Sequence, residues 1–125
     1  MTLQEALDIT DEMRPNGMKR DMKIKHLTDL EQMIHAEVIM KHVHTQEQET
    51  VPVYNEETLP GTVLLIPDPY SKVYWHWLRT RIDEQNLEDA RYNADMTLFD
   101  AAWREMTSWY NRTFMPIMQN RELRI

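Results

Sequence analysis

Five histidines are the residues best suited to bind a metal or to move a proton near neutral pH. His35, His42 and Glu31 have a spacing that can place them on one helix face. A metal site needs three or four converging ligands, and the HExxH pattern is absent. We interpret the histidines as surface or partly packed side chains and predict no metal site.

Acidic pairs flank a predicted break between two helices, Asp83-Glu84 on one side and Glu88-Asp89 on the other. Paired carboxylates perform acid–base chemistry when their surroundings separate their pKa values. Acids also stabilise a helix N-terminus, and Glu88 and Asp89 suit that role. The two serines lie outside any Gly-x-Ser-x-Gly turn. We therefore predict that the chain is not an enzyme and has no cofactor.

Composition excludes several further classes of protein. The 125 residues include no cysteine, which excludes disulfides, zinc knuckles and thiol catalysis, and only 2 glycines, which excludes a glycine-rich phosphate loop. A net charge of −7 argues against a protein that grips nucleic acid through phosphate contacts. No apolar run approaches the roughly 20 residues of a membrane span, and the start of the chain lacks the basic residues of a signal peptide. A single globular domain is predicted.

The first half of the chain predicts two helices. Thr2 and Glu5 form a capping-box pattern, and Pro15-Asn16-Gly17 stops the first helix after Arg14. The second helix is expected from about 18 or 21 to 44, because apolar residues recur there at three- and four-residue steps. Its opposite face is expected to be solvated and consists of Lys23, Lys25, Asp29, Glu31 and Glu37.

Residues 45–68 form an arm between the second and third helices, where three prolines forbid a continuous helix. Val51–Tyr54 and Thr62–Ile66 favour extended structure, and Pro60-Gly61 between them favours a turn. They predict short extended segments that can pair as a small hairpin. Such a pair is marginal alone, so the arm must lean on the helices or on another subunit.

The second half predicts two more helices. Asp68-Pro69 is a favourable helix start, with Asp68 as N-cap, and this helix is expected to end near Asn86. The last helix is expected over 88–113, with an apolar seam of Tyr92, Met96, Phe99, Trp103, Met106 and Tyr110. The fold class is thus all-α: four helices in two helical hairpins, with a domain over 1–116 and a tail over 117–125.

Some apolar residues fall away from the main helical stripes, namely Ile39, Trp75 and Trp109. A helix that is apolar on more than one side must bury both sides. In so small a protein this pattern predicts contacts between subunits.

The order of several short motifs resembles a known family. These motifs are Arg14-Pro15-Asn16; Lys23, Leu27, Leu30 and Glu31; Leu64-Leu65-Ile66-Pro67-Asp68-Pro69-Tyr70; Trp77-Leu78; Ile82-Asp83; Arg91-Tyr92-Asn93; and Trp109-Tyr110-Asn111-Arg112-Thr113-x-Met115-Pro116. Over nearly the whole chain this set is similar to the head–tail connector, or adaptor, proteins of long-tailed bacteriophages and prophages.

The resemblance implies a structural virion protein without enzymatic activity or cofactor. Such proteins are mainly helical, are assembled in the bacterial host cytoplasm, and form a ring at the head–tail neck, usually a dodecamer. The ring docks on the portal protein, extends the DNA channel without binding DNA specifically, and contacts a downstream neck or tail protein; no membrane is involved. The candidate interaction residues are Val53, Tyr54, Trp109, Arg112, Arg121 and Arg124.

An alternative function is a small helical DNA-binding regulator or packaging factor. The two helices around Pro15-Asn16-Gly17 can mimic a helix-turn-helix, whose recognition helix presents basic side chains to the groove. The basic cluster available for this contact consists of Lys19, Arg20, Lys23 and Lys25.

Overall fold

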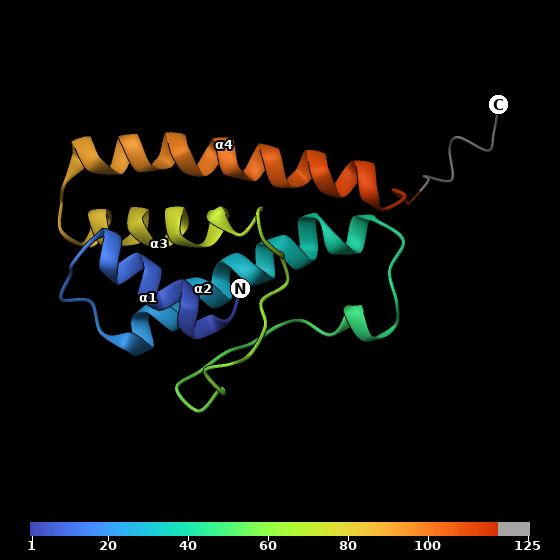
Figure 1. The fold of residues 1–125 in the computed structure, drawn as a ribbon, viewed down its shortest axis with the longest axis horizontal. Helices are drawn as coiled ribbons and strands as arrows, with labels where there is room; N and C mark the ends of the chain where they lie inside the picture. Colours follow the sequence, from blue (N-terminus) through green and yellow to red (C-terminus); the bar gives the residue numbers. More distant parts are fainter. Residues whose placement is uncertain (118–125) are drawn as a thin grey trace.

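Four α-helices joined by loops make up the computed structural model, which describes residues 1–117 (Figure 1). They are α1 (Leu3–Met13), α2 (Arg20–Glu37), α3 (Lys72–Gln85) and α4 (Asp89–Thr113). Two short 3-10 helices, η1 (Ile39–Lys41) and η2 (Glu47–Glu49), lie between α2 and α3. The described part of the chain contains two isolated β-bridges and no β-strand. The predicted all-α class is confirmed.

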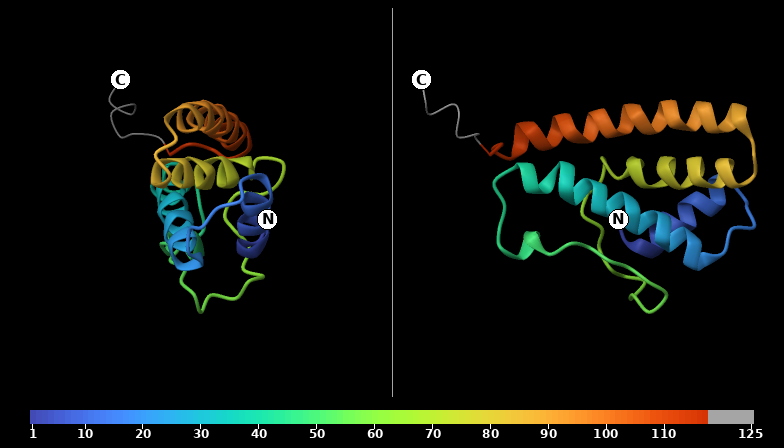
Figure 2. Two further views of the ribbon diagram at one scale, coloured as in Figure 1. Left: turned by 90° about the vertical axis from the view of Figure 1, so that its left-hand side faces the viewer. Right: turned by 180° about the vertical axis from the view of Figure 1, so that it is seen from behind.

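The helices form three layers, with α4 over α3, and α3 over α1 and α2 (Figures 1 and 2). The predicted hairpin of the last two helices is present, because α3 and α4 run antiparallel and pack along their length. The first two helices do not form the predicted hairpin: α1 and α2 lie apart beneath α3, and each packs against α3 rather than against the other. The third helix therefore organises the fold.

The core lies where α3 meets the other helices. Most apolar side chains of α1 and α2 are buried there, represented by Leu7, Leu27 and Ile34, whereas Met13 and Met22 are exposed. The predicted seam of α4 faces α3, with Phe99 and Met106 buried. Each large aliphatic side chain buried in this way stabilises the fold by about 1.5–3 kcal/mol.

The start of α1 is capped as the sequence predicts. The Thr2 hydroxyl accepts from the Glu5 backbone at 3.1 Å, and Glu5 accepts from the Thr2 backbone at 2.8 Å. The Leu3 and Gln4 amides, which have no partner within the helix, donate to carbonyls at Thr62 and Pro60 in the arm. The arm thereby contributes to the beginning of the first helix.

The second helix ends earlier than predicted, at Glu37 rather than near His44. After Val38, whose backbone is still in the αR region, the chain turns through η1, and both Val38 and Ile39 are buried in the core. The Val38 carbonyl accepts from the Lys41 amide at 3.2 Å, and His42 Nδ1 lies 2.6 Å from the same oxygen. Adjacent β-branched residues with low helix propensity favour this early end.

The predicted start of α3 at Asp68-Pro69 is wrong, because the helix begins at Lys72 after Ser71. Residues 67–70 form a turn in which the Tyr70 amide donates to the Pro67 carbonyl. The Asp68 carboxylate accepts a hydrogen bond from the Ser71 hydroxyl instead of capping backbone amides. The Asp68-Pro69 peptide bond is cis.

The two β-prone segments of the arm do not pair as a hairpin. Val63 instead forms an antiparallel bridge with Thr2, and the Leu64 amide donates to the Met1 carbonyl at 3.0 Å. Unpaired donors at the start of α1 give the second segment a better partner than the first segment offers. The first segment, Val51–Tyr54, runs alongside α2.

Candidate interaction surfaces

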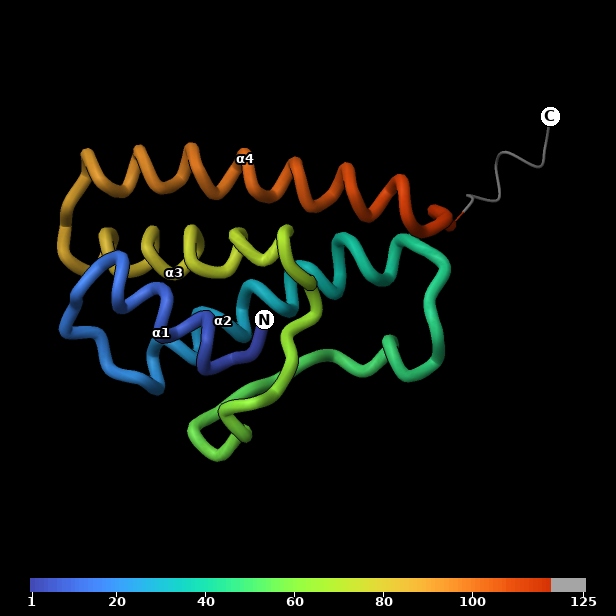
Figure 3. The backbone as a smooth tube through the Cα atoms, in the orientation of Figure 1, coloured from blue at the N-terminus to red at the C-terminus, as the bar shows by residue number. Residues whose placement is uncertain are grey.

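The first half of the arm runs back along α2 (Figure 3), and polar contacts fix it there. His35 Nε2 lies 2.8 Å from the Gln48 carbonyl, and the Gln32 amide donates to the Pro52 carbonyl at 3.1 Å. The Thr28 hydroxyl bonds both the amide and the carbonyl of Tyr54. The arm thus packs on a helix of its own chain. The sequence alone allows either this packing or packing on another subunit.

Glu31 joins both halves of the arm to the helices. Its side chain is fully buried, and its carboxylate accepts from the Tyr74 hydroxyl at 2.5 Å, the Tyr54 hydroxyl at 2.8 Å and the Leu65 amide at 3.0 Å. The Tyr74 hydroxyl also accepts from the Ile66 amide. The prediction that Glu31 is solvated is wrong, because both halves of the arm and α3 converge on it.

Burial governs the titration of this cluster. Loss of solvent raises the pKa of the Glu31 carboxyl above its usual range, although its three hydrogen bonds act in the opposite direction. Burial and the neighbouring Glu31 charge raise the pKa of Tyr54 and of Tyr74 as well. Both tyrosines therefore remain protonated donors at neutral pH.

Replacing Tyr54 by phenylalanine is expected to loosen the arm while the helices stay folded. The substitution removes one of three hydrogen bonds to Glu31 and is expected to cost about 1–2 kcal/mol. Limited proteolysis is expected to cut the variant within residues 46–60 faster than the original chain. Val53→Ala, whose side chain is exposed, is the matched control. Equal cleavage of both variants would contradict a role for Tyr54 in fixing the arm.

The arm surface is the solvent-facing side of residues 51–65. Its exposed apolar side chains are Val51, Val53, Leu59, Val63 and Leu65. Because Pro52 and Tyr54 bond to α2 through their backbones, alternation in an extended chain turns the backbone groups of Val51 and Val53 away from α2. These groups make no hydrogen bond within the described residues. Exposed apolar side chains beside an unpaired backbone edge are typical of a protein-binding segment.

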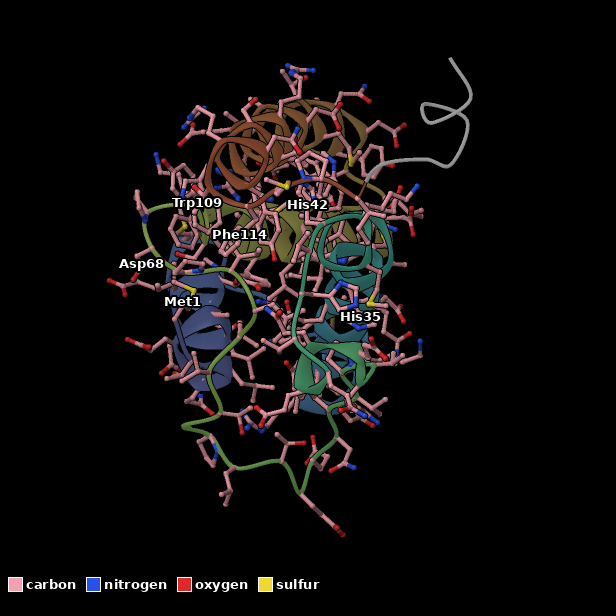
Figure 4. All side chains as sticks on the ribbon, turned by 90° about the vertical axis from the view of Figure 1, so that its right-hand side faces the viewer. Met1, His35, His42, Asp68, Trp109 and Phe114 are labelled. Carbon is pink, nitrogen blue, oxygen red and sulfur yellow. The ribbon has the colours of Figure 1, made fainter. Side chains whose placement is uncertain are left out.

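An aromatic cluster closes the opposite corner of the molecule, at the end of α4 (Figure 4). Tyr70 stacks on Trp109 with ring centroids 4.7 Å apart, and Phe114 packs on Tyr110 at 4.3 Å. His42 meets the edge of Tyr110 at 4.7 Å, and its Nε2 lies 2.6 Å from Asn111 Oδ1. The cluster fixes the ends of α2 and α4 to each other.

The end surface is the outer side of this corner. His42 and Pro116 form an antiparallel bridge, flanked by hydrogen bonds from Val43 to Met115 and from Ile117 to Lys41. Alternation across the bridge turns His42 inward, while Lys41, Val43, Met115 and Ile117 are on the exposed side. We define the end surface as these four residues with the exposed Phe114 and Arg112.

The six predicted interaction residues fall into three groups. Val53 and Arg112 are exposed on the arm surface and the end surface. Tyr54 and Trp109 are half-buried and pack against the core of their own chain. Arg121 and Arg124 lie outside the described residues. Val53 and Arg112 are therefore available for contact with another molecule, whereas Tyr54 and Trp109 mainly hold the two surfaces in place.

The apolar residues that led to the prediction of subunit contacts are mostly internal. Ile39 is buried in the core, Trp109 packs against it, and Trp75 is half-buried. The most exposed large apolar side chains instead lie mainly in loops and at helix ends. Helical periodicity missed them because loop residues follow no period. The candidate surfaces for contacts between subunits are therefore the arm surface and the end surface.

A buried charge cluster joins α1, α3 and α4 at the other end of the molecule. Arg14 pairs with Asp83 and lies 3.2 Å from Asp95, which also pairs with Arg79. Burial and the neighbouring Asp95 raise the pKa of Asp83 to about 6. Burial alone would raise the pKa of Asp95, but its interactions with Asp83 and with the two arginines lower it. The cluster is structural, since its carboxylates are almost fully buried.

The histidines and acids considered as metal ligands or acid–base groups do not form a common site. Among residues 1–117 no group of three His, Asp or Glu side chains is arranged to hold a metal ion. The acids beside the break between α3 and α4 are separated, because Asp83 is buried while Glu88 pairs with Arg91 at the surface. Glu84 and Asp89 line a hollow of about 270 Å³ with Leu87 and Tyr92. Among the described residues, no serine, cysteine, lysine or histidine lines this hollow.

The basic cluster considered for DNA binding is largely engaged within the chain. Lys23 is buried and lies 2.7 Å from Asp11, and Lys25 lies 2.6 Å from Asp29. Arg20 donates to Gln4 at 2.8 Å. Such contacts compete with phosphate contacts, and they disfavour the DNA-binding alternative.

Comparison of the chain with protein-family models, curated proteins and solved structures gave no match. Within the described part of the chain, none of the helices is both long and apolar enough to cross a membrane.

Proposed function

We propose that the chain is a structural virion protein that forms a ring at the head–tail junction of a tailed phage. In this function the copies dock beneath the portal, extend the DNA channel toward the tail and present a surface to the next neck or tail protein. The chain binds and positions other proteins, and it needs no catalytic site or cofactor to do so.

The main support comes from the contacts of the residues that make up the resemblance. Arg14 of the first motif pairs with Asp83 of a later one, and Glu31 bonds the Leu65 amide. Tyr70 stacks on Trp109. Motifs distant in the sequence therefore meet in one folded framework.

Charge is consistent with the proposal. A net charge of −7 disfavours a grip on phosphates, and a channel through which DNA slides needs weak contacts with the backbone. Arg121 and Arg124, near the end of the chain, remain our candidates for contact with the portal.

The protein composition of virions tests this function. Quantitative mass spectrometry of purified particles is expected to find the chain in the same copy number as the portal subunit. Deleting its gene is expected to leave DNA-filled heads and free tails that do not join. Absence of the chain from complete virions would contradict the proposal.

A further inference from the structure

We propose that copies of the chain join head to tail, with the arm surface of one copy packed against the end surface of the next. The inference rests on the proposed function only for the closure of the contacts into a ring. It names the occupant of both exposed apolar surfaces as a second copy of the same chain.

Opposite charge is the first argument for this pairing. The arm surface, residues 51–65, contains the exposed acids Glu56 and Glu57 and no lysine or arginine. The end surface has the exposed cations Lys41 and Arg112, which make no ion pair with a described acid. Each surface thus offers apolar side chains together with charges that the other surface lacks.

The same charges disfavour the symmetric alternatives. Contact between two arm surfaces would bring Glu56 and Glu57 of both copies together, and contact between two end surfaces would do the same for Lys41 and Arg112. Juxtaposed like charges oppose such pairs, whereas opposite charges fix the orientation of the mixed pair. The complementary contact is therefore between two different surfaces.

Backbone chemistry adds a second argument. The free amide and carbonyl groups of Val51 and Val53 form a short edge that an extended segment of a partner can satisfy. The end surface contains two extended segments, at residues 42–44 and 115–117, joined by the bridge between His42 and Pro116. Hydrogen bonds to one of these segments would supplement the apolar contact.

The position of the two surfaces favours propagation. The arm surface lies below α1 and α2, whereas the end surface lies at the far end of α4 (Figure 1). A contact between two different patches leaves one of each free on every pair, so further copies can add. Such contacts generate a ring when the rotation closes.

Engineered disulfides test the pairing directly, because the chain has no cysteine of its own. The test variant combines Val53→Cys on the arm surface with Met115→Cys on the end surface, at side chains that are 66% and 71% exposed. The matched control combines Val53→Cys with Leu87→Cys, which is 85% exposed in the turn before α4. Disulfides form only when the Cα atoms approach to about 4.4–6.8 Å, so they report the specific contact.

After mild oxidation, the test variant is expected to give a ladder of dimers, trimers and higher multimers on a non-reducing gel. The control is expected to give at least several-fold less. Adding Glu56→Lys and Glu57→Lys is expected to abolish the ladder, and further adding Lys41→Glu and Arg112→Glu is expected to restore it.

Three results would overturn the inference. The first is a ladder no stronger than that of the control. The second is dimer formation by the single Val53→Cys variant as efficient as that of the test variant. The third is a ladder that forms only after removal of residues 118–125. The last result would mean that the end of the chain itself occupies the end surface. A ladder from a chain that is absent from virions would support the pairing and contradict the proposed function. A chain that is present in virions but gives no ladder would contradict the pairing and leave the proposed function standing.

Discussion

Replacing Arg14 by alanine is expected to lower the free energy of unfolding by about 3–5 kcal/mol, the cost of breaking a buried ion pair. The substitution leaves the carboxylates of Asp83 and Asp95, which are 1% and 2% exposed, with Arg79 as the remaining cation of the cluster. Because a domain of this size is stable by about 5–15 kcal/mol, the loss is a large share of the total. Urea denaturation followed by circular dichroism measures it.

Arg91→Ala is the control for this prediction, since Arg91 pairs with Glu88 at the surface and is expected to contribute at most about 1 kcal/mol. Adding Asp83→Asn to Arg14→Ala removes the stranded charge and is expected to recover part of the loss. If Arg14→Ala costs no more than Arg91→Ala, the cluster does not hold α1 against α3 and α4.

Replacing Glu31 by alanine is the second large effect, with an expected cost of about 3 kcal/mol or more. The substitution removes the acceptor shared by Tyr54, Tyr74 and the Leu65 amide, and leaves these buried donors without it. Glu37→Ala, on an exposed residue at the end of α2, is expected to change stability little. Equal stability of the two variants would show that the Glu31 cluster is not a structural centre.

Glu31 also predicts a pH dependence with a definite sign. Its pKa in the folded state lies above the ordinary value of 4.5, so the folded state binds the proton more tightly than the unfolded state does. The contribution of Glu31 to stability is therefore greatest below pH 4.5, and it is lost as pH rises through the folded-state pKa. The difference in unfolding free energy between the original chain and Glu31→Gln is expected to fall over this interval. A difference that rises with pH would contradict the assignment.

The helices could be predicted from the sequence because they depend on local signals. The capping box at Thr2 and the stripe through Leu27 and Ile34 are both local, and both are present in the structure. The end of α2 differs from the prediction partly because a distant contact holds the turn that follows it. His42, which lies 2.6 Å from the Val38 carbonyl, is itself held by Asn111, 69 residues further along the chain.

The candidate surfaces were harder to predict for the same reason. Glu31 has a spacing typical of a solvated face, yet its partners lie 23, 34 and 43 residues away. Arg14 and Asp83 are 69 residues apart. Val53 was found through its β propensity, whereas Val43 and Met115 became candidates only when the bridge between His42 and Pro116 placed them together.

The central claim, that copies of this chain form a collar between head and tail, is tested most directly by electron cryomicroscopy of the virion neck. We predict a ring beneath the portal in which the α3–α4 hairpin repeats around the DNA channel and neighbouring copies touch. A neck map in which this chain is missing, or makes no contact with its own copies, would contradict the claim.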